Sequence, residues 1–218
     1  MSVAREDDIG WFVRLGSILL ACSRVQRGEP EAAISLLTEM IAQYRDLRVV
    51  YLLPQNLSSL AEAYGQVGRI EEGLATIAEA VHITETSATA FWAAEVYRLK
   101  GELLLQSGVQ SLGSRVEKSP KSKVQSPKSA KIKSQVLNSK SQEEAEACFL
   151  QAIAIARQQE AKSLELRAAM SLSQLWQQQS KKKQARTLLG EIYGWFTEGF
   201  DTKDLREAKA LLDEFGGE

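Results

Sequence analysis

Residues 144–156, Glu-Ala-Glu-Ala-Cys-Phe-Leu-Gln-Ala-Ile-Ala-Ile-Ala, decide the fold of this chain. Ala145 is followed by Phe149, Ala152 and Ala156 at offsets 4, 7 and 11, which places all four on one face of an α-helix. Small residues on either side of one large ring let a neighbouring backbone come close while Phe149 fills the space between helices. The stretch therefore predicts a helix within a stack of helical hairpins, with the Phe149 ring fully enclosed.

The same offsets recur elsewhere in the chain, each time after another apolar helix that carries a small residue near its middle. Glycine or serine stands at the turn between the two helices, where a left-handed backbone is needed. A pattern that repeats at a fixed spacing indicates a repeat protein. The other copies of the second helix are Ala33/Leu37/Met40/Tyr44, Gly73/Ile77/Ala80/Thr84 and Ala185/Leu189/Ile192/Phe196.

The repeat has a constant spacing that is interrupted once. Gly28, Gly68 and Gly108 follow one another at steps of 40 in the numbering, and Ala145 and Ala185 are separated by the same step. The equivalent positions 73 and 145 are separated by 72 instead, so a surplus of 32 must lie after Gly108. The segment 109–141 fits this surplus, because it is rich in serine and lysine and holds too little apolar surface to offset the entropy of ordering. It predicts a disordered insertion inside the third hairpin.

The first helix is expected at about residues 4–25. Phe12, Leu15, Leu19 and Leu20 give it an apolar side, which we expect to pack on the next helix. The last helix, residues 204–215, has Asp201 or Thr202 as its expected N-cap. Its own apolar side suits an element that covers the end of the stack.

Composition limits the classes of partner. A hydrophobic content of 44% is enough for a continuous core, and a net charge of −1 argues against strong attraction to nucleic acid or a membrane surface. The charge is unevenly spread, because the segment 109–141 carries eight basic side chains and one glutamate. Cys22 and Cys148 fall on apolar helix faces and are interpreted as reduced core thiols. With no signal pattern and no apolar run that could span a membrane, we expect a cytoplasmic protein.

No residue set in the sequence points to catalysis, a cofactor or a metal. A P-loop is excluded because no Gly-Lys dipeptide occurs. His82 is the one histidine, and its place near the end of the fourth helix favours a structural or solvated side chain over a catalytic or zinc-binding one. Acidic pairs such as Glu71 and Glu72 are typical of a first helical turn. We therefore predict a protein that is not an enzyme.

The repeated helices resemble tetratricopeptide repeats (TPR), most clearly in the small, aromatic and small residues Ala145, Phe149 and Ala152 of a second helix. The resemblance implies a right-handed α-solenoid of about four TPR-like hairpins with a 40-residue period and a C-terminal capping helix. The expected organisation is residues 1–108 for hairpins one and two and the first helix of the third, 109–141 for the insertion, 142–198 for the rest of hairpins three and four, and 199–218 for the cap.

Three stretches are more specifically similar to the C-terminal repeat region of large bacterial ATPase regulators, some of which are fused to class III nucleotide cyclases or Ser/Thr kinases. This resemblance implies a regulatory interaction module and no activity for the chain itself. The stretches are Leu60-Ala-Glu-Ala-Tyr-Gly65 with Glu72-Gly-Leu74, Glu95-Val-Tyr-Arg-Leu-Lys-Gly-Glu-Leu-Leu-Leu105, and Lys162-Ser-Leu-Glu-Leu-Arg167 with Tyr193-Gly-Trp-Phe-Thr-Glu-Gly-Phe-Asp-Thr202.

In repeats of this type the first helix of each hairpin lines the concave side, so polar residues on those helices are the expected contacts for a protein or peptide partner. An ATPase, cyclase or kinase domain is the partner that the resemblance implies. An alternative is a nucleic-acid-associated regulator that uses the basic charge of residues 109–141. The residues expected to be exposed on the concave face are Gln55, Glu62, Gln66, Glu95, Arg98, Glu102, Gln174 and Gln178.

Overall fold

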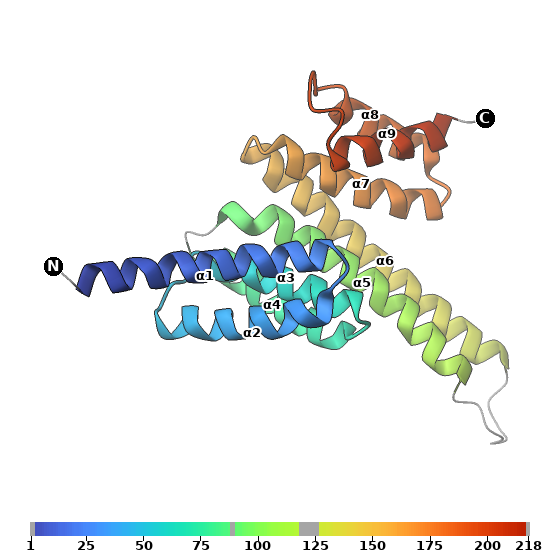
Figure 1. Cartoon of the computed structure of the whole chain (residues 1–218). Coiled ribbons are helices and arrows are strands. Elements are labelled where there is room, and N and C mark those ends of the chain that lie inside the picture. Colours follow the sequence, from blue (N-terminus) through green and yellow to red (C-terminus); the bar gives the residue numbers. More distant parts are fainter. Residues whose placement is uncertain (1–2, 88–89, 118–126, 217–218) are drawn as a thin grey trace. The chain divides into compact units, whose positions relative to one another are not determined.

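A computed structural model describes residues 3–87, 90–117 and 127–216, and every regular element in those ranges is a helix (Figure 1). The all-α fold class predicted from the sequence is confirmed. The chain forms two compact units, residues 1–92 and 93–218. Within each unit, every helix packs against the helix that precedes it.

The first unit consists of two hairpins and a short 3₁₀ turn. Its elements are α1 (Val3–Gln26), α2 (Pro30–Asp46), α3 (Leu53–Gln66), α4 (Ile70–Thr86) and η1 (Ala90–Trp92). The first helices of the two hairpins, α1 and α3, also contact each other, as stacked hairpins require. Pro30 opens α2 and Pro54 lies in the first turn of α3, where a missing backbone N–H costs nothing.

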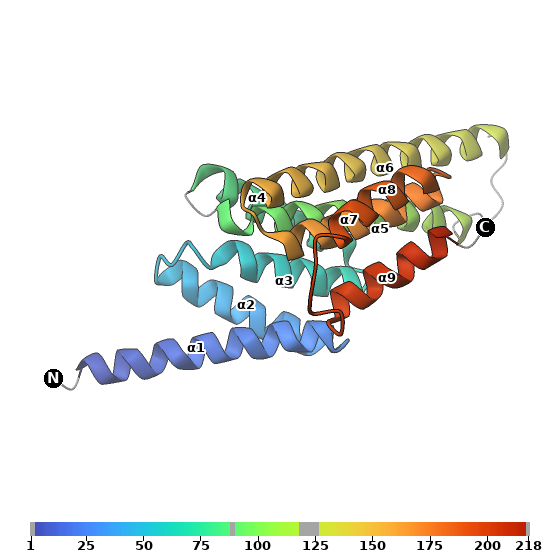
Figure 2. The same cartoon turned by 90° about the horizontal axis from the view of Figure 1, so that it is seen from above.

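The second unit adds two more hairpins and a final helix. Its elements are α5 (Ala93–Glu117), α6 (Pro127–Gln158), α7 (Lys162–Gln178), α8 (Lys182–Tyr193) and α9 (Lys203–Gly216). The first helices α5 and α7 contact each other, and α9 packs on both α7 and α8 (Figure 2). The predicted terminal helix is therefore present. Of its expected apolar side, Leu205, Ala208 and Leu211 are buried, whereas Leu212 is partly exposed. The Thr202 hydroxyl donates to the carbonyl of Gly199 at its start.

Five of the turns have the same backbone geometry. One residue takes a positive φ, and the next residue donates its N–H to a carbonyl five positions back at 2.8–2.9 Å, which is the Schellman motif. Gly28 and Gly68 were predicted from the sequence, and Ser180 was predicted as a serine turn. The two further positive-φ residues are Arg48 and Glu160. The positive-φ residues at 28, 48 and 68 are evenly spaced, and those at 160 and 180 have the same spacing. Each helix with its turn therefore takes up half of the repeat period.

The predicted core positions of the second helices are confirmed with one exception, Phe196, which lies beyond the end of α8 (Lys182–Tyr193) and is partly exposed. Phe149 is fully buried, as are Leu37, Ile77 and Leu189 at the equivalent positions. The first helices carry smaller side chains at the repeat position that faces these residues. Three of them, Ala21, Ala61 and Ser173, are fully buried. Small residues on one helix thus lie opposite large ones on the other, which suits the close packing of protein interiors.

The predicted apolar side of α1 is wrong. Phe12 is 69% exposed and Leu19 is 60% exposed, whereas Ile18, Ala21 and Val25 are the buried residues. The repeat register explains the difference, because Ala21 is equivalent to the fully buried Ala61. The side of α1 that faces inward is determined by its packing against α2 and α3. The number of large apolar residues on a side does not determine it.

The predicted bounds of the insertion also differ from the structure. Residues 109–117 continue α5 and residues 127–141 belong to α6, so both stretches have a helical backbone; residues 118–126 lie outside the described residues. Extending an existing helix avoids the cost of a new nucleus, and lysine, glutamine and alanine favour the helical state. Gly108, predicted as a turn, is instead a buried residue within α5. A β-carbon there would lie 3.1 Å from Cβ of Ser141, so this glycine lets α5 and α6 approach closely.

Candidate functional site

Polar residues lie at equivalent repeat positions of the first helices, on α3 in the first unit and on α5 and α7 in the second. The repeat register makes Gln55, Glu95 and Arg167 equivalent, and it does the same for Glu62, Glu102 and Gln174. One helical turn further along, each of these helices carries a glutamine at the equivalent position. All three glutamines are exposed: Gln66, Gln106 and Gln178. We call these positions the first-helix polar face, which each unit carries on its own helices: α3 in the first unit, and α5 and α7 in the second.

In the second unit the polar face is organised by Arg98. Its guanidinium donates to both carboxylate oxygens of Glu95, with Nη2 at 2.6 Å from Oε1 and Nε at 2.9 Å from Oε2. It also forms an ion pair with Glu102, one turn further along α5. The fork of an arginine fits two carboxylates in this way, because its five N–H donors have fixed directions.

Helices α7 and α9 extend the same network. Arg167 of α7 lies 3.2 Å from Glu95 Oε1, so Glu95 is held by two arginines. Arg167 is also 3.9 Å from the carboxylate of Asp204 in α9. The Ser171 hydroxyl donates to Glu102 at 2.9 Å. These contacts fix the spacing of α5, α7 and α9 and leave Glu102, Arg167 and Asp204 each more than a third exposed.

Arg98 was expected to be exposed, and this prediction is wrong. Its side chain is only 8% exposed, because its stem is buried within the unit while its charged end joins two carboxylates. Glu95 is also largely covered, at 18%, and Glu102 is partly covered. Gln66, Gln174 and Gln178 are exposed as predicted, and Gln55 and Glu62 are partly exposed.

The structure adds four residues to the face that sequence reasoning missed. They are Gln106, Arg167, Ser171 and Asp204. The register could have identified Gln106 and Arg167, because they are equivalent to Gln66 and to Gln55. It could not have identified Ser171, whose equivalent on α5 is the buried Leu99. Asp204 has no repeat equivalent, so its place in the network depends on how α9 folds back.

A second ionic cluster joins α6 to α7 away from this face. Glu165 is buried, with its carboxylate 2.6 Å from Arg157 Nε and 2.8 Å from Lys162 Nζ. Burial alone would raise the pKa of Glu165, but the hydrogen bonds and charges of Arg157 and Lys162 outweigh it and hold that pKa below its usual value. The cluster fixes the turn between the two helices.

The remaining reactive groups do not converge. Burial is the main cause that raises the pKa of the Cys148 thiol, with a smaller opposing effect of Lys100, and a raised pKa disfavours the reactive thiolate. His82 is exposed on α4. In the parts of the chain that the structure describes, no three metal-ligating side chains gather, and no helix is long and apolar enough to cross a membrane.

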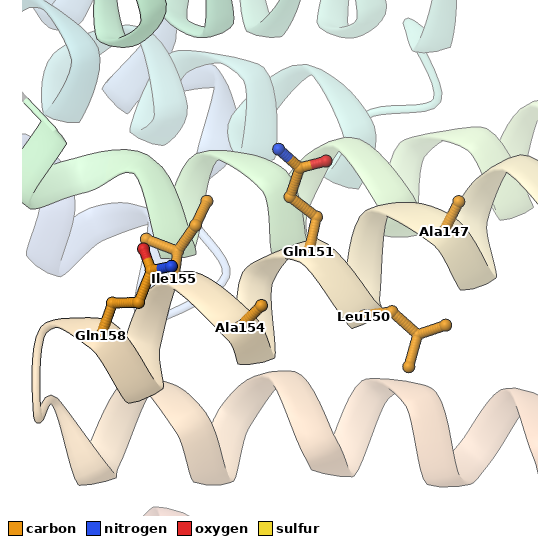
Figure 3. Close-up of a pocket in the computed structure, with 6 residues that line it drawn as sticks. All are labelled: Ala147, Leu150, Gln151, Ala154, Ile155 and Gln158. Atoms are coloured by element: carbon orange, nitrogen blue, oxygen red, sulfur yellow. The ribbon is translucent and has the colours of Figure 1, made fainter.

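Two open grooves lie on second helices of the second unit. One, of about 540 Å³, is lined by α6 alone, through the residues drawn in Figure 3: Ala147, Leu150, Gln151, Ala154, Ile155 and Gln158. The other, of about 430 Å³, lies between Trp176 of α7 and the outward side of α8. Neither groove encloses a small molecule, since both are open along a helix.

Comparisons with known proteins give limited information. No protein-family model matches the chain, and no curated protein does. Among solved structures, the kinesin-light-chain TPR-like repeats of Podosopora anserina are similar over 93% of this chain and 96% of theirs, with 17% identity and a TM-score of 0.33. A variant of those repeats is similar over 82% and 92%, with 19% identity and a TM-score of 0.36. Likenesses this weak carry no conclusion about function.

Proposed function

We propose that this protein is a non-catalytic scaffold that binds a protein or peptide partner through the first-helix polar face. The observation that supports the proposal is the repeated placement of exposed glutamines, Gln66, Gln106 and Gln178, at equivalent positions of α3, α5 and α7. Each glutamine offers two donors and one acceptor group, so Gln106 and Gln178, which lie on the neighbouring helices α5 and α7 of one unit, suit successive amides of an extended chain.

The charges of the face favour a polar partner over a highly charged one. Glu95 is already held by Arg98 and Arg167, and Glu102 by Arg98 and Ser171. A basic segment would have to compete with these internal pairs, which reduces its gain from ion pairing. Hydrogen bonding to the glutamines, with the ionic network as a rigid support, is therefore the proposed mode of recognition.

The proposed role is regulatory, in association with an ATPase, cyclase or kinase domain. Its support is the similarity of three sequence stretches to the repeat region of bacterial ATPase regulators, and one of these stretches carries Glu95, Arg98 and Glu102. The scaffold would hold the partner in place and would supply no chemistry itself.

Site-specific photo-crosslinking tests the proposal. A photoreactive residue is introduced in turn at positions 66, 106 and 178 of the full chain, expressed in its native host, and at position 184 on the exposed side of α8 as a control. The expected result is a crosslinked protein at the first three positions and none at the control. Crosslinks only from position 184, or from none of the four, would contradict the polar face as the binding surface. Mass spectrometry of the products tests the expected ATPase, cyclase or kinase partner.

The alternative of nucleic-acid association has support only in the basic composition of residues 109–141. A mobility-shift titration with random-sequence duplex DNA tests it. Binding that falls steeply with salt and disappears when the eight basic residues of 109–141 are all replaced by glutamine would favour the alternative.

A further inference from the structure

One side of α1, the outermost helix of the first unit, is apolar and exposed (Figure 2). We define the α1 end face by the five residues that lie along this side: Phe12, Gly16, Leu19, Leu20 and Ser23. Phe12 is 69% exposed, Leu19 60% and Leu20 44%, and none of the five residues carries a charge. Three large apolar side chains that stay in contact with water on one side of a helix are typical of an interaction surface.

The helix α7 shows what covers the equivalent side of a first helix. The Ser171 hydroxyl donates to Glu102 of α5, and the Trp176 indole N–H donates to Glu146 of α6 at 2.9 Å. Both residues therefore face the preceding hairpin, and so does the side of α7 that lies between them on the helical wheel. That side consists of three fully buried residues, Ala168, Leu172 and Leu175.

The α1 end face occupies the same positions of the repeat. In the register, Gly16, Leu20 and Ser23 are equivalent to the three buried residues of α7. On α3 these positions are buried as well, and α3 packs on the preceding second helix, α2. The residues there are Asn56, Leu60 and Ala63. A second helix thus covers this side of α3 and of α7, whereas the same side of α1 is exposed.

The residue types of the α1 end face also suit a packed helix. Leu20 has a leucine at the equivalent position of α3 and of α7. Nothing lies within 4 Å of a β-carbon added to Gly16, so the backbone of another helix can approach α1 closely at this point. Ser23 is as small as its equivalent Ala63, and its hydroxyl accepts a hydrogen bond from Arg27 at 3.0 Å.

The second helices indicate which kind of helix fits this surface. Glu146 marks the side of α6 that faces α7, and Ile153, two turns further along the same side, is buried. At the equivalent positions α2 carries Ile34 and Ile41, of which Ile41 is buried. The helix that covers a first helix therefore has a large apolar residue on this side, and in α2 it has two of them seven positions apart.

We propose that the α1 end face docks an α-helix of another protein, and that this helix carries large apolar residues seven positions apart, as α2 does. The docked helix takes the place on α1 that α2 takes on α3. The first-helix polar face has no residue on α1, so this surface does not depend on the function proposed above. Because the docked helix rests on α1 alone, the contact is smaller than the roughly 800 Å² per partner of a standard complex, and the binding is weak.

A helical peptide tests the docking surface on the full chain. The probe has the sequence of residues 29–48, which includes α2, and is stapled between positions 35 and 39, which are exposed on α2 and keep it helical in isolation. Fluorescence anisotropy is expected to show saturable binding. Ile41→Lys in the peptide should weaken the binding at least about tenfold, because it puts a charge on the docking side.

Variants of the chain locate the binding site of the peptide. Leu19→Glu and Leu20→Glu should each weaken binding at least about tenfold. Leu47→Glu is the matched control, because Leu47 is an exposed leucine of the same unit outside the α1 end face, and it should leave binding unchanged. Circular dichroism melting of each variant separates loss of binding from loss of folding.

Two results of the peptide experiment would overturn the proposal. One is the lack of saturable binding up to about 1 mM. The other is binding that persists in both Leu19→Glu and Leu20→Glu, because the peptide would then have replaced α2 within the chain. A photoreactive residue at position 19, in the native host, tests the source of the helix. Crosslinks within an amphipathic helix of another protein are expected, and crosslinks only to a second copy of this chain, or none, contradict the proposal.

Discussion

The ring of Phe149 lies directly against Gly101, so that a β-carbon added to Gly101 would come within 2.5 Å of Cε1 and 2.8 Å of Cδ1. At this position of the repeat, the largest of the four second-helix residues is thus matched to the smallest of the four first-helix residues. In the other hairpins the equivalent positions are occupied by Ala21 and Leu37, by Ala61 and Ile77, and by Ser173 and Leu189, in which the size difference is less extreme.

Gly101→Ala should destabilise the protein by about 1–3 kcal/mol, because the fully buried ring has no space into which to move. Urea unfolding followed by circular dichroism measures the change. Gly16→Ala is the control, since nothing lies within 4 Å of a β-carbon there, and the higher helix propensity of alanine should make that variant slightly more stable. In a Phe149→Leu background the cost of Gly101→Ala should shrink, and equal costs in both backgrounds would contradict the close contact.

Replacing Arg98 should cost more than replacing an exposed arginine. Arg98→Leu leaves the carboxylates of Glu95 and Glu102 without their main partner in a half-buried position, so a loss of about 1–3 kcal/mol is expected in thermal or urea unfolding. Arg69→Leu, which breaks the exposed pair with Glu72, should leave stability unchanged within error. Similar losses in the two variants would show that the α5 network is no stronger than a surface pair.

Acid should weaken the turn between α6 and α7 through Glu165. The pKa of Glu165 is lower in the folded chain than in the unfolded chain, so its contribution to stability is present above the unfolded value of about 4.5 and is lost as the pH falls toward the folded value. Glu165→Gln removes this titration. We expect the melting temperature of the wild type to fall more steeply than that of the variant below about pH 4.5. Parallel profiles would rule out a stabilising role for the ionised carboxylate.

Ser180→Gly should stabilise the protein by about 1 kcal/mol. Ser180 ends α7 with a φ of 62°, a conformation that is strained for a side chain with a β-carbon and free of strain for glycine. Glycine already occupies the equivalent turn at Gly68, where φ is 76°. The reverse change, Gly68→Ser, should therefore destabilise by a similar amount, and chemical denaturation of both variants checks the sign.

Asn56→Val should maintain or raise stability, although it removes a polar side chain. Asn56 is fully buried in α3, and neither end of its amide has a hydrogen-bond partner among the described residues. The equivalent positions hold Val96 and Ala168, which are fully buried and apolar. A buried amide without partners costs about 1–3 kcal/mol, which valine would recover apart from its lower helix propensity. A clear loss of stability on calorimetry would indicate that the amide is satisfied in solution.

The residues of the insertion illustrate a limit of composition as a guide. Serine and lysine content predicted that residues 109–141 are disordered, yet the backbone is helical at both ends of that range. Composition reports what a segment can bury by itself, whereas a helix that is already nucleated and packed beyond the segment continues into it at little cost. Gly108 shows a second limit. Glycine is compatible both with a turn and with a close approach of two helices, so the residue type alone did not distinguish the two.

The sequence by itself determined the period, the pairing of helices into hairpins and the buried positions of the second helices, because these follow from local spacing on a regular helix. The tertiary structure alone decided which side of α1 faces inward, how Arg98 comes to be buried between Glu95 and Glu102, and how Asp204 reaches Arg167. Those outcomes depend on which helices lie side by side and on the distance between them, and neither quantity is contained in the spacing of residues along one helix.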